Sequence, residues 1–245
     1  MLPEIADRFY DVTPFEYGYF ISFFWIFILL ITVLMLFLCY LYLTMRRSLE
    51  RESESLAFSH MAIEGLETER RRVSRELHDT VLPLIRDGEL SDLIRGICME
   101  LTPPDFSRLS LKEALADLCL KFMQRSGINC SYSIEEELNF AGLNTENQLH
   151  LYRMVQESLT NIEKHSQAKE AVLVARYYTR GSQENILVCV SDDGVGIGDE
   201  GAENLGLRSL RQRAAIMGAQ LDFISESGNG LMVRIEIPEQ VTGKR

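Results

Sequence analysis

An uninterrupted apolar run near the start of the chain constrains its fold more than any other feature. No charged residue occurs from Tyr17 to Met45. A bilayer core about 30 Å thick is crossed by roughly 20 helical residues, so this run is long enough to span it. Trp25 near one end and Tyr42 near the other suit the membrane–water interfaces. The sequence therefore predicts a transmembrane helix over residues 17–45.

The charges that flank this run predict its orientation. Arg46 and Arg47 follow it directly, and the positive-inside rule places a basic flank in the cytoplasm. Residues 1–16 would then be a short extracytoplasmic N-terminus, too short to fold as a sensor domain. Their acidic character and the length of the run argue against a cleaved signal peptide. We expect a single-pass protein of the cell membrane whose stimulus is read by the membrane segment, by a membrane partner or from inside.

The charge balance and the cysteines exclude other classes of site. The formal net charge is -11, whereas nucleic-acid binding depends on clustered Lys and Arg, so we expect no direct contact with nucleic acid. The cysteines form neither a CxxC pair nor a Cys/His spacing typical of zinc, which indicates free thiols in a reducing compartment. These cysteines are Cys39, Cys98, Cys119, Cys130 and Cys189.

One long charged helix is predicted over residues 46–77, and its first part, residues 46–68, has the pattern of a coiled-coil linker. Leu49, Leu56 and Ile63 recur every seven residues, and charged side chains fill most other positions. Such a seam would pair two copies of the chain as a homodimer. A solvated single helix is the alternative interpretation.

A histidine suited to chemistry follows this linker. Leu77 and Val81 belong to an apolar stripe with His78 at its edge, which would leave the imidazole exposed. A neutral imidazole can attack a phosphoryl group, and the adjacent carboxylate of Asp79 can orient the ring or take its proton. A structural histidine is the alternative.

The helix that carries His78 is predicted to be short. Pro83 would kink it one turn beyond His78. Arg86, Asp87 and Gly88 form a turn signal, and a short helix from about Glu89 to Leu101 follows. Residues 69–105 therefore indicate a short helical hairpin.

Residues 106–240 alternate between helical and strand patterns, which predicts an α+β domain with helices on one face of a single sheet. The predicted helices are Leu111–Arg125, about Thr145–His165 and about Leu207–Met217, and the predicted strands are Ile128–Ile134, Ala171–Tyr178, Ile186–Ser191, Gln220–Ser225 and Leu231–Ile237.

Polar side chains share one face of the helix predicted near residues 145–165. These are Glu157, Asn161, Lys164 and His165. Carboxylate and amide oxygens suit Mg²⁺, and an ammonium suits phosphates. We expect this face to meet a Mg²⁺–triphosphate, with Lys164 and His165 contacting the nucleotide and Glu157 acting in catalysis. A polar solvated face is the alternative interpretation.

Glycines alternate with other residues directly after the strand at 186–191. Gly194 and Gly196 would let the backbone approach a flat ligand closely. Asp192 can accept a hydrogen bond from an exocyclic amine such as that of adenine. A glycine-rich hairpin turn is the alternative.

A third motif opens the last predicted helix. Gly206, Leu207 and Arg208 lie where a helix N-terminus can bind phosphate, although an arginine is also an ordinary helix residue. The Gly- and Glu-rich stretch at 198–205 just before it suits a mobile lid.

These motifs carry a resemblance to known families. The pattern R-x-x-x-R-E-L-H-D, from Arg71 to Asp79, resembles the H-box of histidine kinases typified by nitrate/nitrite and membrane-fluidity sensors, in which the histidine is phosphorylated and the aspartate assists. The three later motifs resemble the N, G1 and G2 boxes of the GHKL ATPase superfamily. That resemblance implies an ATP-binding α/β sandwich with Asn161 near Mg²⁺, Asp192 on adenine and Gly206 at the lid hinge.

The same resemblance implies that Gly194 and Gly196 shape the base pocket. The chain departs from the family patterns at three points, and the largest departure is a helical hairpin over residues 69–105 that is much shorter than the two long helices of the family. Pro83 stands where the family usually carries a glutamine that serves phosphatase activity. Leu231 ends the sequence Gly228-Asn229-Gly230-Leu231, where the family pattern GxGT has a threonine.

The fold class predicted from the sequence is a single N-terminal transmembrane helix, a coiled-coil linker, a short dimerising helical hairpin and an α+β two-layer sandwich of the GHKL type. The predicted function is a sensor histidine kinase that autophosphorylates on His78 with ATP and Mg²⁺ and passes the phosphoryl group to an aspartate of a cytoplasmic response regulator. A degenerate ATP-binding scaffold without autokinase activity is the alternative, and a GHKL protein-serine kinase is a third hypothesis.

Overall fold

The computed structural model describes residues 14–180, 183–196, 205–225 and 230–238. It divides into two compact units, Met1–Ser55 and Leu56–Arg245, which are considered separately. Three predicted features lie wholly or largely outside the described residues: the extracytoplasmic segment 1–16, the lid stretch 198–205 and the first two residues of the sequence at 228–231.

The first unit consists of the N-terminal part of helix α2 (Pro14–Glu76). Within it, Ile21–Ser48 is long and apolar enough to cross a membrane, and none of this stretch is buried. Side chains such as Phe23 and Leu36 are exposed along the helix. Removing apolar surface from water is favourable by about 25 cal/mol of free energy per Å². A hydrocarbon environment would therefore stabilise this unit.

In the second unit, the regular α-helix of α2 ends just before His78 and is followed by a wider turn and then a tighter one. The α-helix ends at Glu76 and continues as a π-helical turn, Leu77–Val81, and a 3₁₀ turn, Leu82–Leu84. Pro83 explains the change, because it has no N–H to donate and its ring clashes with the preceding turn of an α-helix.

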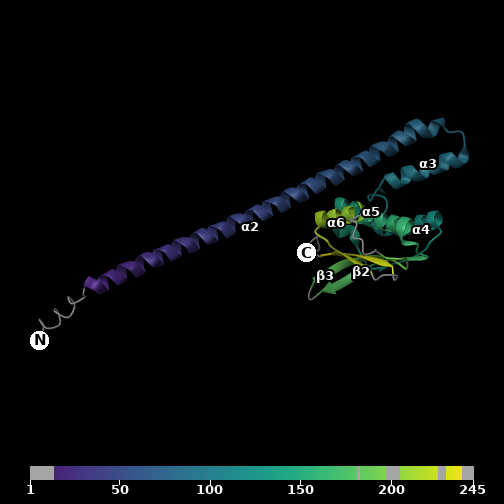
Figure 1. Cartoon of the computed structure of the whole chain (residues 1–245). Coiled ribbons are helices and arrows are strands. Elements are labelled where there is room, and N and C mark those ends of the chain that lie inside the picture. Colours follow the sequence, from purple (N-terminus) through teal and green to yellow (C-terminus); the bar gives the residue numbers. More distant parts are fainter. Residues whose placement is uncertain (1–13, 181–182, 197–204, 226–229, 239–245) are drawn as a thin grey trace. The chain divides into compact units, whose positions relative to one another are not determined.

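Helix α3 (Gly88–Leu101) returns along α2 as the second arm of the predicted hairpin (Figure 1). Asp87 caps it by accepting a hydrogen bond from the N–H of Glu89 at 2.9 Å. Ser74 of α2 donates to the carbonyl oxygen of Cys98 at 3.0 Å, and both residues are buried. These contacts hold the two arms together.

The ATPase-like half is one five-stranded sheet in the order β1-β2-β3-β5-β4. Strands β1 and β2 are parallel, and the other neighbours are antiparallel. The strands are β1 (Asn129–Ile134), β2 (Glu170–Arg180), β3 (Gln183–Asp192), β4 (Gln220–Ser225) and β5 (Leu231–Ile237).

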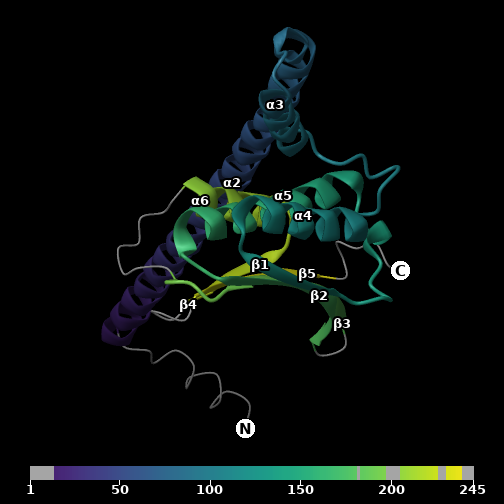
Figure 2. The same cartoon turned by 90° about the vertical axis from the view of Figure 1, so that its right-hand side faces the viewer.

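Three helices cover one face of this sheet (Figure 1, Figure 2). They are α4 (Leu111–Ser126), α5 (Thr145–Asn161) and α6 (Leu205–Met217). Their apolar sides meet the sheet in a core that includes Leu115, Leu151, Leu173 and Ile235. The predicted α+β two-layer sandwich is confirmed.

Helix α5 is shorter than its sequence pattern predicts. The α-helix ends at Asn161 and continues as one π-helical turn, Ile162–Ser166, before Gln167 reverses the chain with a φ of 56°. An α-helical spacing therefore relates Glu157 to Asn161, whereas Lys164 and His165 lie on the wider turn.

A buried carboxylate joins α2 to α5 and α6, and we call the residues Glu67, Arg153 and Arg213 the Glu67 clamp. Glu67 Oε2 accepts hydrogen bonds from Arg153 at 2.8 and 3.1 Å, and Oε1 accepts one from Arg213 at 2.8 Å. Burial alone would raise the pKa of Glu67, but the two guanidinium groups outweigh burial and lower it. The carboxylate therefore remains ionised at neutral pH.

The clamp also accounts for a difference from the predicted coiled coil. Ile63, one turn before Glu67 and on the predicted seam, is only 3% exposed within its own chain. Leu56 and Leu66 remain exposed. One predicted seam position is thus used inside the chain, while the coiled coil itself stays a prediction.

His150 of α5 completes the surroundings of the clamp. Its Nδ1 lies 3.2 Å from Arg213 Nη1. A guanidinium only donates, so Nδ1 accepts and the neutral ring carries its hydrogen on Nε2. That Nε2 is buried without a hydrogen-bond partner, 3.7 Å from Glu146 Oε1. Burial, and then the charge of Arg213, lower the pKa of His150.

This environment predicts acid sensitivity. Because the pKa of His150 in the folded protein lies below its ordinary value of 6.5, the unfolded chain binds a proton first as pH falls. Stability should be complete above that ordinary value and should decline as pH falls toward the lowered pKa. We expect His150→Gln to flatten this decline in thermal unfolding midpoints of the full-length protein in detergent. Equal declines in both proteins would contradict the assignment.

Candidate functional site

Helices α5 and α6 meet at the residues of the first and third motifs. A Cβ added to Gly206 would lie 2.5 Å from Glu157 Oε1 and 3.0 Å from Asn161 Oδ1. The first turn of α6 therefore packs directly on the last turn of α5. This packing brings Glu157, Asn161 and Gly206 together, as the nucleotide-site hypothesis requires.

The second motif folds against the end of the first. A Cβ on Gly194 would overlap the backbone carbonyl oxygen of Ser166. The same oxygen accepts a hydrogen bond from the N–H of Val195 at 2.8 Å. Because the obstacle is backbone, only glycine fits at 194 without displacing the chain. The turn after β3 is thereby fixed to the π-helical turn that carries Lys164 and His165.

Asp192 stands at the end of β3 in a partly buried position. Burial raises its pKa, and hydrogen bonds from the N–H groups of Gly194 and Leu231 oppose the rise. Gly194 donates to Asp192 Oδ1 at 2.8 Å. Carboxylate lone pairs beyond those used here can accept a hydrogen bond from the amine of a flat ligand.

Two backbone contacts near Asp192 were not foreseen from the sequence. A Cβ on Gly230, whose φ is 79°, would overlap the carbonyl oxygen of Asp192. Asp193 Oδ1 accepts hydrogen bonds from the N–H groups of Lys169 and Glu170 at 2.8 and 2.9 Å. The only sequence signal for the first was the glycine pattern at 228–231, which does not say what the glycine packs on.

The remaining predicted nucleotide residues differ in exposure. Lys164, His165 and Arg208 are exposed, so their side chains are accessible to a ligand that approaches from solvent. Leu207 is partly buried and packs against the hydrophobic core, so its side chain has a structural role in this arrangement. Gly196 has a φ of 73°, a conformation that favours glycine.

His78 lies on the π-helical turn after α2, which packs against α3. Its side chain is 67% exposed, and its Nδ1 is 3.0 Å from Asp79 Oδ1. An ionised carboxylate only accepts hydrogen bonds, so Nδ1 carries the hydrogen of the neutral ring. The lone pair is then on Nε2, which is the atom that can attack an electrophile.

The residues that could hold Mg²⁺ are Asn161 and Glu157, whose side-chain oxygens lie next to Gly206. Mg²⁺ prefers about six oxygen ligands in octahedral geometry and usually shares them with substrate phosphates and water. Among the described residues, no three or more His, Cys, Asp or Glu side chains form a group that could hold a metal ion. The amide oxygen of Asn161 fits a Mg²⁺ ion held mainly by a nucleotide.

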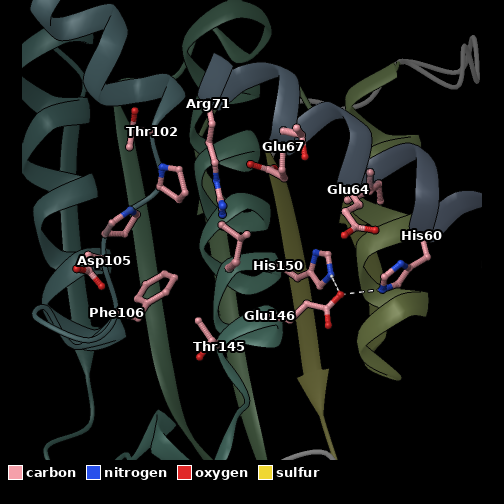
Figure 3. A pocket seen from close by; sticks show the side chains of 15 residues that line it. His60, Glu64, Glu67, Arg71, Thr102, Asp105, Phe106, Thr145, Glu146 and His150 are labelled. Atoms are coloured by element: carbon pink, nitrogen blue, oxygen red, sulfur yellow. Dashed lines mark hydrogen bonds and ion pairs between the residues drawn. The ribbon is translucent and has the colours of Figure 1, made fainter. Parts of the chain in front are cut away.

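A separate pocket of about 720 Å³ lies between α2, the start of α5 and the segment after α3 (Figure 3). His60, Arg71, Phe106 and His150 are among its lining residues, and Glu67 forms part of its wall. No predicted site residue lines it, so this pocket is distinct from the candidate nucleotide site.

Comparisons with known proteins agree with these motifs. Residues 146–241 match the family described as histidine kinase-, DNA gyrase B-, and HSP90-like ATPase. The sensor histidine kinase LiaS of Bacillus subtilis is 26% identical over 69% of this chain and 54% of its own length. The oxygen sensor histidine kinase NreB of Staphylococcus carnosus is 29% identical over 72% of this chain and 58% of its own length. The chain thus spans little more than half the length of these relatives.

A solved histidine kinase domain, from the blue-light activated histidine kinase EL346 of Erythrobacter litoralis, is similar with a TM-score of 0.49 and 21% identity, over 71% of this chain and 85% of that one. The resemblance predicted from the motifs is confirmed by the family match and the curated relatives. The chain is therefore related to sensor histidine kinases and carries, over residues 146–241, an ATPase domain of the histidine kinase, DNA gyrase B and HSP90 type.

Proposed function

We propose that the chain is a membrane-anchored sensor histidine kinase, which phosphorylates its own His78 with ATP and passes the phosphoryl group to an aspartate of a response regulator. One observation carries this proposal: an exposed histidine has its Nδ1 paired with Asp79 in a chain that also contains an ATPase domain. The pairing leaves Nε2 free as a nucleophile.

The chemistry of the transfer follows from that pairing. A bond forms between His78 Nε2 and the γ-phosphorus of ATP, the bond from that phosphorus to the bridging oxygen breaks, and ADP leaves. The ring would become cationic as the new bond forms, and Asp79 accepts the Nδ1 proton. Phosphoryl transfer needs little further help from protein groups beyond positioning and charge neutralisation.

The nucleotide half of the mechanism is assigned to the three motifs. Asp192 accepts a hydrogen bond from the adenine amine, and Gly194 and Gly196 shape the base pocket, Gly194 by letting the turn after β3 pack on the carbonyl oxygen of Ser166. Lys164, His165 and Arg208 face the phosphates. Bound Mg²⁺ would neutralise charge on the phosphates, and Asn161 with Glu157 would help to hold it.

The membrane and partner assignments are part of the same proposal. The candidate span Ile21–Ser48 anchors the protein as a single-pass membrane protein with its ATPase domain in the cytoplasm. Exposed apolar residues on the cytoplasmic part of α2, such as Phe58 and Leu66, support a homodimer through this helix.

The first test is transfer of label from γ-labelled ATP to the full-length protein in membranes. We expect acid-labile label on the parent, none above background on His78→Gln, and at least about tenfold slower labelling of Asp79→Asn, because general-base help contributes roughly 10²–10⁴-fold. Binding of ATP should be equal in all three. An unlabelled parent that still binds ATP would instead support the scaffold function, and acid-stable label would support a serine kinase.

The second test concerns the base pocket. We expect Asp192→Asn to weaken ATP binding about 10- to 100-fold, since a hydrogen bond to a charged group contributes roughly 1.5–3 kcal/mol. The matched control is Asp193→Asn, whose amide oxygen can still accept the hydrogen bonds from Lys169 and Glu170. Calorimetric titration with a non-hydrolysable ATP analogue would measure both. Similar losses in the two variants would contradict the role of Asp192.

A further inference from the structure

The Glu67 clamp connects the linker helix to both helices of the candidate nucleotide site. Arg153 lies on α5, two turns before Asn161, and Arg213 lies on α6, two turns after Gly206. Glu67 lies on α2, outside the region that matches the ATPase family. A single carboxylate from the linker therefore touches both elements that would hold the nucleotide.

The contact is built as a complete polar cluster. Glu67, Arg153 and Arg213 are 6%, 2% and 4% exposed. Arg153 also donates to the carbonyl oxygens of Glu100 and Leu101 at the end of α3, at 3.0 and 2.8 Å. Figure 3 shows Glu67 on α2 beside His150 of α5. Removing the carboxylate would leave two buried cations without their counterion. The packing of α2 on α5 and α6 would then be strongly disfavoured.

The hydrogen bonds that Arg153 and Arg213 donate can be accepted by two sets of groups. With α2 in place, Glu67 and the α3 carbonyl oxygens accept their hydrogen bonds. With α2 moved away, water would accept them instead, because α2 is what covers this side of the domain. The structure shows the first arrangement, and a stimulus that moves α2 would favour the second.

The position of the clamp bears on phosphoryl transfer. Glu67 precedes His78 by eleven residues, roughly 16 Å along a helix. His78 itself remains 67% exposed, with Asp79 as its hydrogen-bond partner. Transfer requires the attacking nitrogen and the phosphorus to come within about 3–3.5 Å in a closed arrangement that excludes water. A histidine this exposed is not covered by its own nucleotide domain while that domain is held at Glu67.

We propose that Glu67 is a positioning residue that holds the ATPase domain on the linker helix in a resting position, and that opening this contact frees the domain to phosphorylate His78. The second half of this inference rests on the proposed kinase function, whereas the first half does not. The stimulus then acts by moving α2 relative to Arg153 and Arg213.

The test uses Glu67→Gln in the full-length protein in membranes, with Glu64→Gln as the matched control. Glu64 lies one turn earlier on α2, is exposed and lines the same pocket. We expect Glu67→Gln to raise the initial labelling rate about fivefold or more, within the usual range of coupling between sites, with the KM for ATP unchanged within twofold. Glu67→Asp, which keeps the charge, and Glu64→Gln should label like the parent.

Hydrogen exchange supplies a readout that does not depend on kinase activity. In Glu67→Gln, amides of α2 near residues 60–70 should exchange faster, while those of β3 and β5 should not change. Unchanged exchange on α2 would overturn the clamp, and faster exchange without faster labelling would overturn the resting position. If the parent itself takes no label, the proposed kinase function fails and the exchange result alone decides the clamp.

A second variant guards against misfolding. If Glu67→Gln also loosens β3 and β5, Arg213→Gln removes one arm of the clamp and leaves the pair of Glu67 with Arg153 intact. The same direction of change in exchange and labelling, smaller in size, is expected. Slower labelling with a stable sheet would overturn the proposal.

Discussion

The ion pairs between two buried guanidinium groups and one carboxylate are the interaction on which the second unit, Leu56–Arg245, depends. Arg153 and Arg213 come from the helices that carry the candidate nucleotide residues, and neither can be buried without a counterion. Glu67 supplies that counterion from a helix whose other end has the composition of a membrane span. The ATPase domain and the linker are therefore chemically incomplete without each other in this packing.

The sequence predicted the sheet and its covering helices closely because their signals are local. Alternating apolar residues indicated β4 and β5 with the bounds that the structure has. The Glu67 clamp could not be predicted in this way. A charged residue on a helix is usually solvated, and only tertiary packing reveals that Glu67, Arg153 and Arg213 converge.

The candidate site was partly predictable for the same reason. The spacing of Asp192 and Gly194 predicted a close approach of the backbone to a flat ligand, whereas in the structure the atom next to Gly194 is the carbonyl oxygen of Ser166. Gly230 was visible as a glycine, but its contact with the backbone of Asp192 joins residues nearly forty positions apart. The sequence pattern therefore shows where a glycine stands, whereas the order of the strands in the sheet determines which residue that glycine contacts.

The two helices that carry proposed phosphoryl-transfer groups end in the same unusual way. Helix α2 passes into a π-helical turn at His78, and α5 passes into one at Lys164 and His165. A π turn shifts the residues after it off the face that an α-helix would give them, and such turns occur frequently at functional sites. At His78 the cause is Pro83, in the 3₁₀ turn that follows directly. Pro83 therefore affects not only its own position but also the turn that holds the proposed nucleophile, because it prevents the α-helix from continuing past that turn.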